Sequence, residues 1–162
     1  MAEIPINDHD TLNLGNPNAP HQLTVVMNLS CRYCKQWWRR NFKTIQSAMD
    51  AGRLALHIKF WTVNKPALLI GNIAHQFIDF KHPEMAFEFV KKLIQNQNDF
   101  KRYSVEAVPK YLQSEYGVVT HNDDSDIINT TLELKSAGVR GIPTIIIDGN
   151  WHDSYHYRLP EL

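Results

Sequence analysis

The sequence has few cysteines, no excess of charge of either sign and no long apolar run. Only two of its 162 residues are cysteines, too few for the disulfide framework of a small secreted scaffold. Lysines plus arginines number 17, as do aspartates plus glutamates, which argues against a strongly basic nucleic-acid binder. The longest uncharged run, residues 66–78, is interrupted by polar residues and is too short to cross a bilayer, so we expect no membrane span.

The rest of the composition is that of an ordinary globular protein, with 43% hydrophobic and 21% charged residues. The length suits one domain, which we expect to span residues 1–162. The first residues show neither a basic leader nor an apolar stretch typical of a secretory signal. We therefore expect a cytoplasmic protein, or an extracytoplasmic one if an earlier signal has been removed.

Hydrophobic patterning predicts an α/β protein in which strands alternate with helices. The first strand is followed by a helix that begins near Cys31 and ends at Gly52, with Trp38 in the core and Trp37 partly exposed. Four helices between the second and third strands form a helical insertion over residues 64–137. The predicted strands are 22–28, 54–63 and 144–148, with a hairpin partner around 151–155, and the inserted helices are 66–79, 83–97, 104–116 and 123–137.

The two cysteines form a C-x-x-C motif at the start of the first helix. Ser30 is placed to cap this helix, and the Cys31 thiol would face unpaired backbone N–H groups and the positive end of the helix dipole. Both features favour the thiolate. Cys34 lies one turn later on the same side of the helix. Cys31 could therefore open a partner's disulfide, and Cys34 could then displace the partner from the mixed disulfide.

Basic residues surround this motif, and no acid occurs in the helix before Asp50. The cations lower the cost of a thiolate, so we expect the pKa of Cys31 in the range of roughly 3.5–7.5 seen at such sites. Arg32 and Tyr33, the two residues inside the motif, are the candidates for tuning this pKa. A solvated surface, or a weak patch for an acidic partner, is the alternative interpretation. The cations concerned are Arg32, Lys35, Arg39, Arg40 and Lys43.

C-x-x-C is also half of a zinc site, so a metal-binding protein is a rival hypothesis. A four-ligand site needs two further ligands at regular spacing, and the eight histidines do not supply them beside a second cysteine pair. We therefore expect no metal, and histidines that are exposed or lie in loops. No organic cofactor is expected either, because a cysteine pair itself carries two electrons.

A second motif, Gly141-Ile142-Pro143-Thr144, leads into the last buried strand. Proline cannot donate a hydrogen bond to a sheet, so Pro143 should lie at the mouth of the strand. A cis Ile142–Pro143 bond would be a deliberate feature at this position.

Three segments together resemble the thioredoxin superfamily, and more closely its DsbA-like branch, in which a helical insertion interrupts the thioredoxin fold. They are the turn-rich entry 15–20, the strand that leads into Cys31-Arg32-Tyr33-Cys34, and the loop 139–144. The resemblance implies that Cys31 is an exposed nucleophile and Cys34 a shielded resolving thiol. It also implies that Pro143 packs over the pair and that the Ile142 backbone binds a peptide as an added strand.

The sequence departs from this family in several places. Val25 stands where many relatives hold a buried acid, which leaves Lys59 or a water as candidates to remove the Cys34 proton. The Arg32-Tyr33 dipeptide leaves oxidase, isomerase and reductase roles open. Few residues follow the hairpin, so we expect the closing helix to be short or absent, with a dimer or the inserted helices covering that face.

These observations predict a thiol-disulfide oxidoreductase that exchanges disulfides with protein substrates through the Cys31–Cys34 dithiol. Its partners would be protein thiols or disulfides and an unidentified redox recycling partner, with no nucleic acid and an open oligomeric state. The alternative is a non-catalytic, redox-sensitive peptide-binding or chaperone module that uses the groove beside Pro143.

Overall fold

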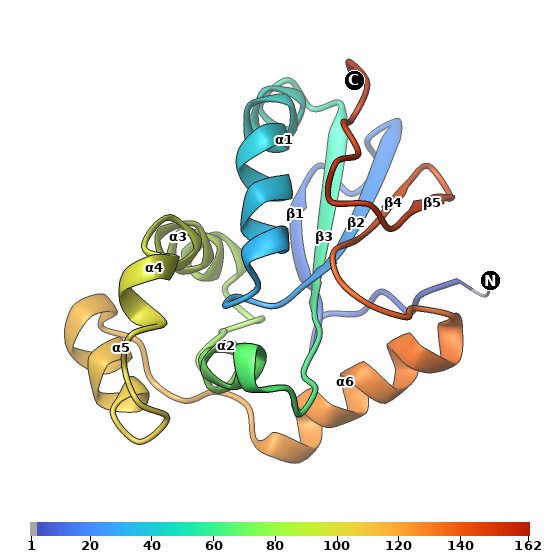
Figure 1. Cartoon of the computed structure of the whole chain (residues 1–162). Coiled ribbons are helices and arrows are strands. Elements are labelled where there is room, and N and C mark those ends of the chain that lie inside the picture. Colours follow the sequence, from blue (N-terminus) through green and yellow to red (C-terminus); the bar gives the residue numbers. More distant parts are fainter. Residues whose placement is uncertain (1–2) are drawn as a thin grey trace.

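A five-stranded mixed sheet forms the centre of the structure, a computed structural model that describes residues 3–162 (Figure 1). The strand order is β1-β3-β2-β4-β5; β2 and β3 are parallel and the other pairs are antiparallel. Helix α1 (Arg32–Asp50) makes the crossover between the two parallel strands. The strands are β1 (Leu12–Gly15), β2 (His21–Met27), β3 (Leu54–Phe60), β4 (Thr144–Ile147) and β5 (Asn150–His152).

The chain between β3 and β4 is helical, so the predicted α/β fold with a helical insertion is confirmed. Helices α2 to α5 gather beside the N-terminal end of α1, and α6 crosses below the sheet near the end of β3 (Figure 1). Within residues 3–162, no helix is both long and apolar enough to cross a membrane. The inserted elements are a 3₁₀ turn (Pro66–Leu68), α2 (Leu69–His75), α3 (Pro83–Gln95), α4 (Gln97–Phe100), α5 (Val108–Tyr116) and α6 (Asp124–Ala137).

Local signals explain most of these boundaries. Asp123 caps α6 by accepting a hydrogen bond from the Asp126 backbone N–H, and Gly138 ends that helix in the left-handed conformation. Some predicted extents were wrong. The helix expected over residues 66–79 breaks into a 3₁₀ turn and a helix that stops at His75, and the helix expected over residues 104–116 begins only at Val108. Strand β1 was not predicted, because it is only four residues long and lies in an opening segment rich in turn-forming residues.

Helix α1 buries a wider stripe than its spacing indicated. Trp37, expected to be partly exposed, is fully buried, as is Ile45, and Trp38 is nearly so. Asn41 is buried between them and is satisfied by backbone: its side-chain amide donates to the Trp37 carbonyl (2.9 Å), and its Oδ1 accepts from the Leu159 N–H (2.9 Å). Polar side chains thus join α1 to the end of the described chain.

The tail after β5 lies along α1 in a non-helical conformation. Arg40 donates to the Tyr155 carbonyl (3.2 Å), and Leu159 is buried beside Asn41. Tyr155 also packs its ring against Tyr33, with ring centres 4.7 Å apart. Within the described residues, the side of α1 that a closing helix would cover is therefore contacted by an extended tail.

One sheet face carries a buried ion pair. Lys59 on β3 is fully buried, and its ammonium lies 3.0 Å from the Asp10 carboxylate. Thr130 of α6 donates to the same carboxylate at 2.8 Å. Burial acts to raise the pKa of Asp10, but the hydrogen bonds and the charge of Lys59 outweigh it and hold the pKa below its usual value. The Lys59 Nζ thus contacts Asp10 and the Pro5 carbonyl, and the role suggested for Lys59 at Cys34 stays a prediction.

Replacing Asp10 should show how much an unpaired buried Lys59 charge lowers the free energy of unfolding. Asp10→Asn leaves the Lys59 charge without its counter-ion, and we expect a loss of about 3–5 kcal/mol in the free energy of unfolding. The double variant Asp10→Leu/Lys59→Met removes both charges and should recover most of this loss. Urea unfolding followed by far-UV circular dichroism measures both; equal stability of the two variants would contradict the ion-pair argument.

Candidate redox site

The short loop between β2 and α1 places the C-x-x-C motif at the same end of the sheet as the loop containing Pro143. β2 ends at Met27, and four residues later the chain reaches Cys31. Antiparallel pairing sets Val26 opposite Thr144, the first residue of β4. Pro143, directly before Thr144, is therefore at the same end of the sheet as Cys31. Topology brings together two segments that are more than 100 residues apart.

Asn28 organises the loop that leads to Cys31. Its amide donates to the Trp61 carbonyl (2.9 Å) and to Asn72 (2.8 Å), and its Oδ1 accepts from the Ser30 N–H (2.9 Å). The Cys31 N–H then donates to the Asn28 carbonyl at 3.1 Å. Asn28 is buried, so its hydrogen bonds are shielded from water and fix the entry to the helix.

Helix α2 packs tightly against this loop. The Gly71 N–H donates to the Ser30 hydroxyl at 3.1 Å, and that hydroxyl donates to the Ala67 carbonyl at 2.9 Å. A Cβ on Gly71 would overlap the Asn28 Oδ1 and crowd the Ser30 backbone. Only glycine allows this approach. Ser30, expected to cap α1, instead joins the loop to the helical insertion.

Two further buried side chains from the insertion bind the same loop. His75 accepts from the Leu29 N–H through Nε2 (3.3 Å), which leaves Nδ1–H to donate to the Thr62 hydroxyl (2.9 Å). Gln97 of α4 donates to the Leu29 carbonyl (2.9 Å) and the Cys31 carbonyl (3.1 Å). The expectation that the histidines are exposed or lie in loops is thus wrong for His75, a fully enclosed residue of α2.

Cys31 itself is the N-cap of α1. Its sulfur accepts a hydrogen bond from the Cys34 backbone N–H at 3.3 Å. The two cysteines are free thiols in this structure, and Cys31 retains 7% of its surface against 3% for Cys34. The freely exposed Cys31 expected from the resemblance is therefore not found, because the loop is enclosed by α2 and α4. Cys31 is still the more accessible of the two.

The surroundings separate the acidities of the two thiols. A hydrogen bond from the Cys34 side chain, opposed by burial and assisted by the backbone N–H groups of Cys34 and Tyr33, lowers the pKa of Cys31 to about 6. Burial, together with the hydrogen bond and charge of Cys31, raises the pKa of Cys34 well above its usual value. Cys31 is the group suited to nucleophilic attack near neutral pH, with Cys34 held as a thiol.

The residues inside the motif act differently from one another. Tyr33 contributes its backbone N–H to the Cys31 thiolate. The Arg32 guanidinium turns to the Tyr33 phenol, donating to its hydroxyl at 2.9 Å and lying 4.8 Å from the ring centre. The cation whose charge does act on Cys31 is Lys101, directly after α4. A tuning role for the Arg32 side chain stays a prediction.

The loop before β4 has the predicted form. The Ile142–Pro143 bond is cis, Pro143 is buried and Ile142 is partly buried against the core. The Thr144 hydroxyl donates to the Gly141 carbonyl at 2.7 Å and closes the turn.

Sequence reasoning missed Asn28, Gly71, His75, Gln97 and Lys101. Four of them come from the insertion, where no motif marks them. Asn28 had a signal, since a polar residue at the end of an apolar strand needs hydrogen-bond partners. Within residues 3–162, no three side chains of His, Cys, Asp or Glu gather as a metal site would require.

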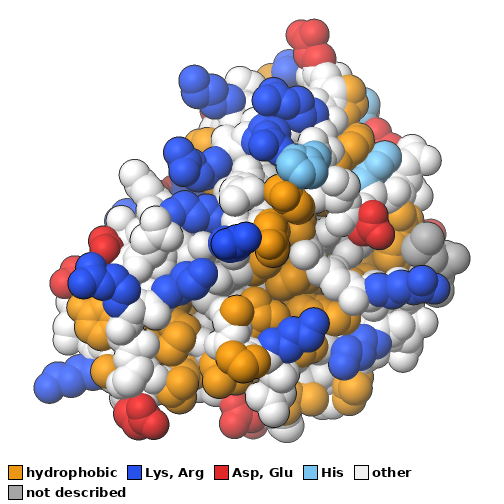
Figure 2. Space-filling view, in the orientation of Figure 1, with side chains coloured by type: hydrophobic (Ala, Val, Ile, Leu, Met, Phe, Trp, Pro, Cys, Tyr) orange, Lys and Arg blue, Asp and Glu red, His pale blue; other side chains and the backbone are white. Residues whose placement is uncertain are grey.

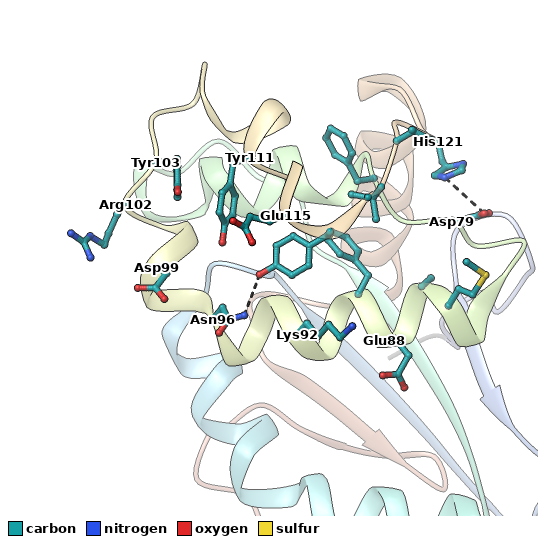
Figure 3. A pocket seen from close by; sticks show the side chains of 18 residues that line it. Asp79, Glu88, Lys92, Asn96, Asp99, Arg102, Tyr103, Tyr111, Glu115 and His121 are labelled. Atoms are coloured by element: carbon teal, nitrogen blue, oxygen red, sulfur yellow. Dashed lines mark hydrogen bonds and ion pairs between the residues drawn. The ribbon is translucent and has the colours of Figure 1, made fainter. Parts of the chain in front are cut away.

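A separate cavity of about 1020 Å³ lies between α3 and α5, lined by neither cysteine (Figure 3). Tyr103 and Tyr111 stack there with ring centres 4.1 Å apart. Asn96 of the α3–α4 junction donates to the Tyr116 hydroxyl at 3.3 Å. The cavity belongs to the helical insertion and not to the redox site.

Comparison with known proteins agrees with this architecture. A family model described as thioredoxin matches residues 7–158, and the chain belongs to that family. Solved structures of BdbD, alpha-DsbA1 and ScsC share its fold. None of the curated proteins compared with the chain matches it.

Three solved structures illustrate the likeness. A conserved protein of unknown function from Enterococcus faecalis V583 is 26% identical, with a TM-score of 0.83 over 91% of this chain and 85% of that one. Oxidised BdbD from Bacillus subtilis is 15% identical, with a TM-score of 0.68 over 95% and 89%. Alpha-DsbA1 from Wolbachia pipientis is 18% identical, with a TM-score of 0.72 over 94% and 86%. The latter two likenesses show the fold.

The acidity of Cys31 can be measured directly. In the reduced protein, thiolate absorbance near 240 nm should rise with a midpoint near pH 6, because the hydrogen bonds above favour the thiolate. Cys31→Ser should abolish this step, and Cys34→Ser should retain a thiolate that forms below the range of a free thiol. A single transition at about pH 8–9 in the reduced protein would contradict the assignment.

His75 should make stability depend on pH. Burial lowers its pKa to about 3, whereas an unfolded histidine titrates near about 6.5, so the unfolded state binds the extra proton between these values. We expect the free energy of unfolding to fall by up to about 1.4 kcal/mol per pH unit between about pH 6 and 4.5. His75→Gln should reduce this slope by about one proton in urea titrations, and an unchanged slope would refute the role of His75.

Proposed function

We propose that the protein is a thiol-disulfide oxidoreductase that acts on protein substrates through Cys31 and Cys34. The observation that carries the proposal is the split acidity of the pair: a helix-capping sulfur with a pKa of about 6 beside a thiol whose pKa is raised. Membership of the thioredoxin family supports the general chemistry. The cysteine pair carries the two electrons, and no cofactor is required.

In the reducing direction, the Cys31 thiolate attacks one sulfur of a substrate disulfide. The substrate S–S bond breaks, a bond forms between Cys31 and the substrate, and the departing substrate sulfur leaves as a thiolate that takes a proton from water. The backbone N–H groups at the start of α1 stabilise the thiolate that Cys31 offers. Because Cys31 is only 7% exposed, the substrate sulfur must reach it through the small part of its surface that faces solvent.

Cys34 then resolves the mixed disulfide. Besides burial, the negative charge of Cys31 raises the pKa of Cys34. Bonding of Cys31 to the substrate removes this charge, so Cys34 gives up its proton to water more readily at this stage. Its thiolate attacks the Cys31 sulfur, a Cys31–Cys34 bond forms and the second substrate thiolate departs. Two electrons pass from protein to substrate. The reverse sequence oxidises a substrate dithiol, and the reduction potential decides between the two directions.

The loop containing Pro143 is the proposed docking element. The loop lies at the same end of the sheet as Cys31, so the Ile142 backbone can pair with an extended substrate as an added strand. In this arrangement Ile142 and Pro143 bind substrate, while Cys31 and Cys34 react.

The compartment belongs to the proposal as well. One solved structure with the same fold is a periplasmic thioredoxin-like protein from Salmonella enterica serovar Typhimurium, at 18% identity. That likeness fits the extracytoplasmic alternative, in which the pair would work in an oxidising environment.

Insulin reduction tests the activity. With dithiothreitol as the electron source, the protein should accelerate precipitation of the insulin B chain, and Cys31→Ser should remove the acceleration. Cys34→Ser should trap a mixed disulfide that is visible on a non-reducing gel. Lys110→Gln, an exposed substitution on α5 that keeps both thiols, serves as the folded control. A protein that neither accelerates the reaction nor forms the mixed disulfide would be a binding module and not a catalyst.

A further inference from the structure

A groove of about 710 Å³ lies between α1 and α3, beside the redox site. Four of its lining residues are cations: Lys35 and Arg39 from α1, and Lys91 and Lys92 from α3. Glu88 is the acid among the lining residues, and it pairs with Lys91 at 2.6 Å. The lining therefore carries a clear excess of positive charge, although the whole sequence has none.

The surface of the molecule shows the same asymmetry. In Figure 2, Lys and Arg side chains gather over the side where α1 and α3 lie, with few acidic side chains between them. Arg39 and Lys92 are exposed and Lys35 is partly exposed, so these charges face solvent and act on an approaching partner. Two of the five cations expected from the sequence to surround Cys31, Lys35 and Arg39, thus line a groove that α3 completes.

The floor of the groove is apolar, and one end of the groove lies next to the C-x-x-C motif of α1. Trp38, Phe42 and Ile94 form the floor, and Phe42 is partly exposed. Lys35 follows Cys34 directly. At the other wall, Gln95 is two residues from Gln97, whose amide binds the Cys31 carbonyl at 3.1 Å. A chain lying in the groove is therefore delivered to the reactive end of α1.

We propose that this basic groove docks an acidic segment of the disulfide-bearing protein substrate, with an apolar side chain of that segment against Phe42. The inference rests on the proposed function and adds a preference for substrates with Asp or Glu beside the disulfide. A protein segment is favoured over a nucleic acid because the groove has an apolar floor and lies in a chain of zero net charge.

Binding is tested first without any chemistry. The protein with Cys31→Ser and Cys34→Ser is titrated against a fluorescein-labelled, cysteine-free peptide that contains several Glu and one Phe. We expect binding that weakens as salt rises, because exposed charges are screened within about 10 Å at 0.1 M salt. Lys91→Gln/Lys92→Gln should weaken binding about threefold to tenfold. Lys110→Gln, an exposed charge on α5 outside the groove, is the matched control and should change nothing.

Kinetics then tests the preference. The reduced protein reacts with two peptide disulfides that differ in having acidic or neutral residues around the cysteine. Wild type should react faster with the acidic peptide at low salt, and Lys91→Gln/Lys92→Gln should lower that rate about threefold to tenfold while the neutral rate stays within about twofold.

The outcomes are distinct. Equal rates with both peptides, or an acidic preference that survives the double substitution, would refute the docking of acidic segments in the groove. The proposed exchange reaction would still stand. Absence of exchange with either peptide would overturn the proposed function, and the binding titration would still decide for or against the groove. Tighter binding of a labelled oligonucleotide than of the peptide, lost in the double variant, would also overturn the assignment to a protein segment.

Discussion

The site depends on the buried hydrogen bonds that the inserted helices make with the loop that ends at Cys31. Helix α2 supplies the Gly71 N–H and the His75 imidazole, and α4 supplies the Gln97 amide. Each meets a backbone or side-chain group of residues 28–31, and all of them lie away from solvent. Buried hydrogen bonds of this kind are costly to break, because a lost partner leaves a desolvated polar group behind. The insertion is therefore part of the redox site and not an appendage to it.

These hydrogen bonds also contribute to the difference in acidity between the two cysteine thiols. Cys31 caps α1 because the loop fixes the orientation of its side chain, and the cap position places backbone N–H groups on its sulfur. Cys34, one turn further on, is enclosed more completely, so burial acts against its thiolate. Two chemically identical side chains thereby acquire opposite tendencies. Under the proposed function, Cys31 is the attacking thiolate, and Cys34 reacts only after a mixed disulfide has formed.

Much of this arrangement could be predicted from the sequence, because the relevant signals are local. The C-x-x-C spacing, the apolar strand before it and the Pro143 turn each depend on neighbouring residues, and the α/β fold with its insertion followed from periodicity. The capping residue was wrongly predicted as Ser30, because a serine hydroxyl is the stronger general cap and its competing partners in α2 lie some 40 residues away. Gln97 and Lys101 carry no sequence signal, since tertiary packing alone brings them to Cys31. The Trp37 prediction was wrong for the same reason.

Lys101 stands after α4, some 70 residues along the chain from the cysteines, yet its charge acts on the Cys31 sulfur. Part of the stabilisation of the Cys31 thiolate therefore comes from a stretch of chain that can vary independently of the C-x-x-C motif. Among homologues that keep Arg32-Tyr33, changes near the end of α4 would change the pKa of Cys31 and, with it, the reduction potential of the pair. Comparing the dipeptides alone would not reveal such divergence.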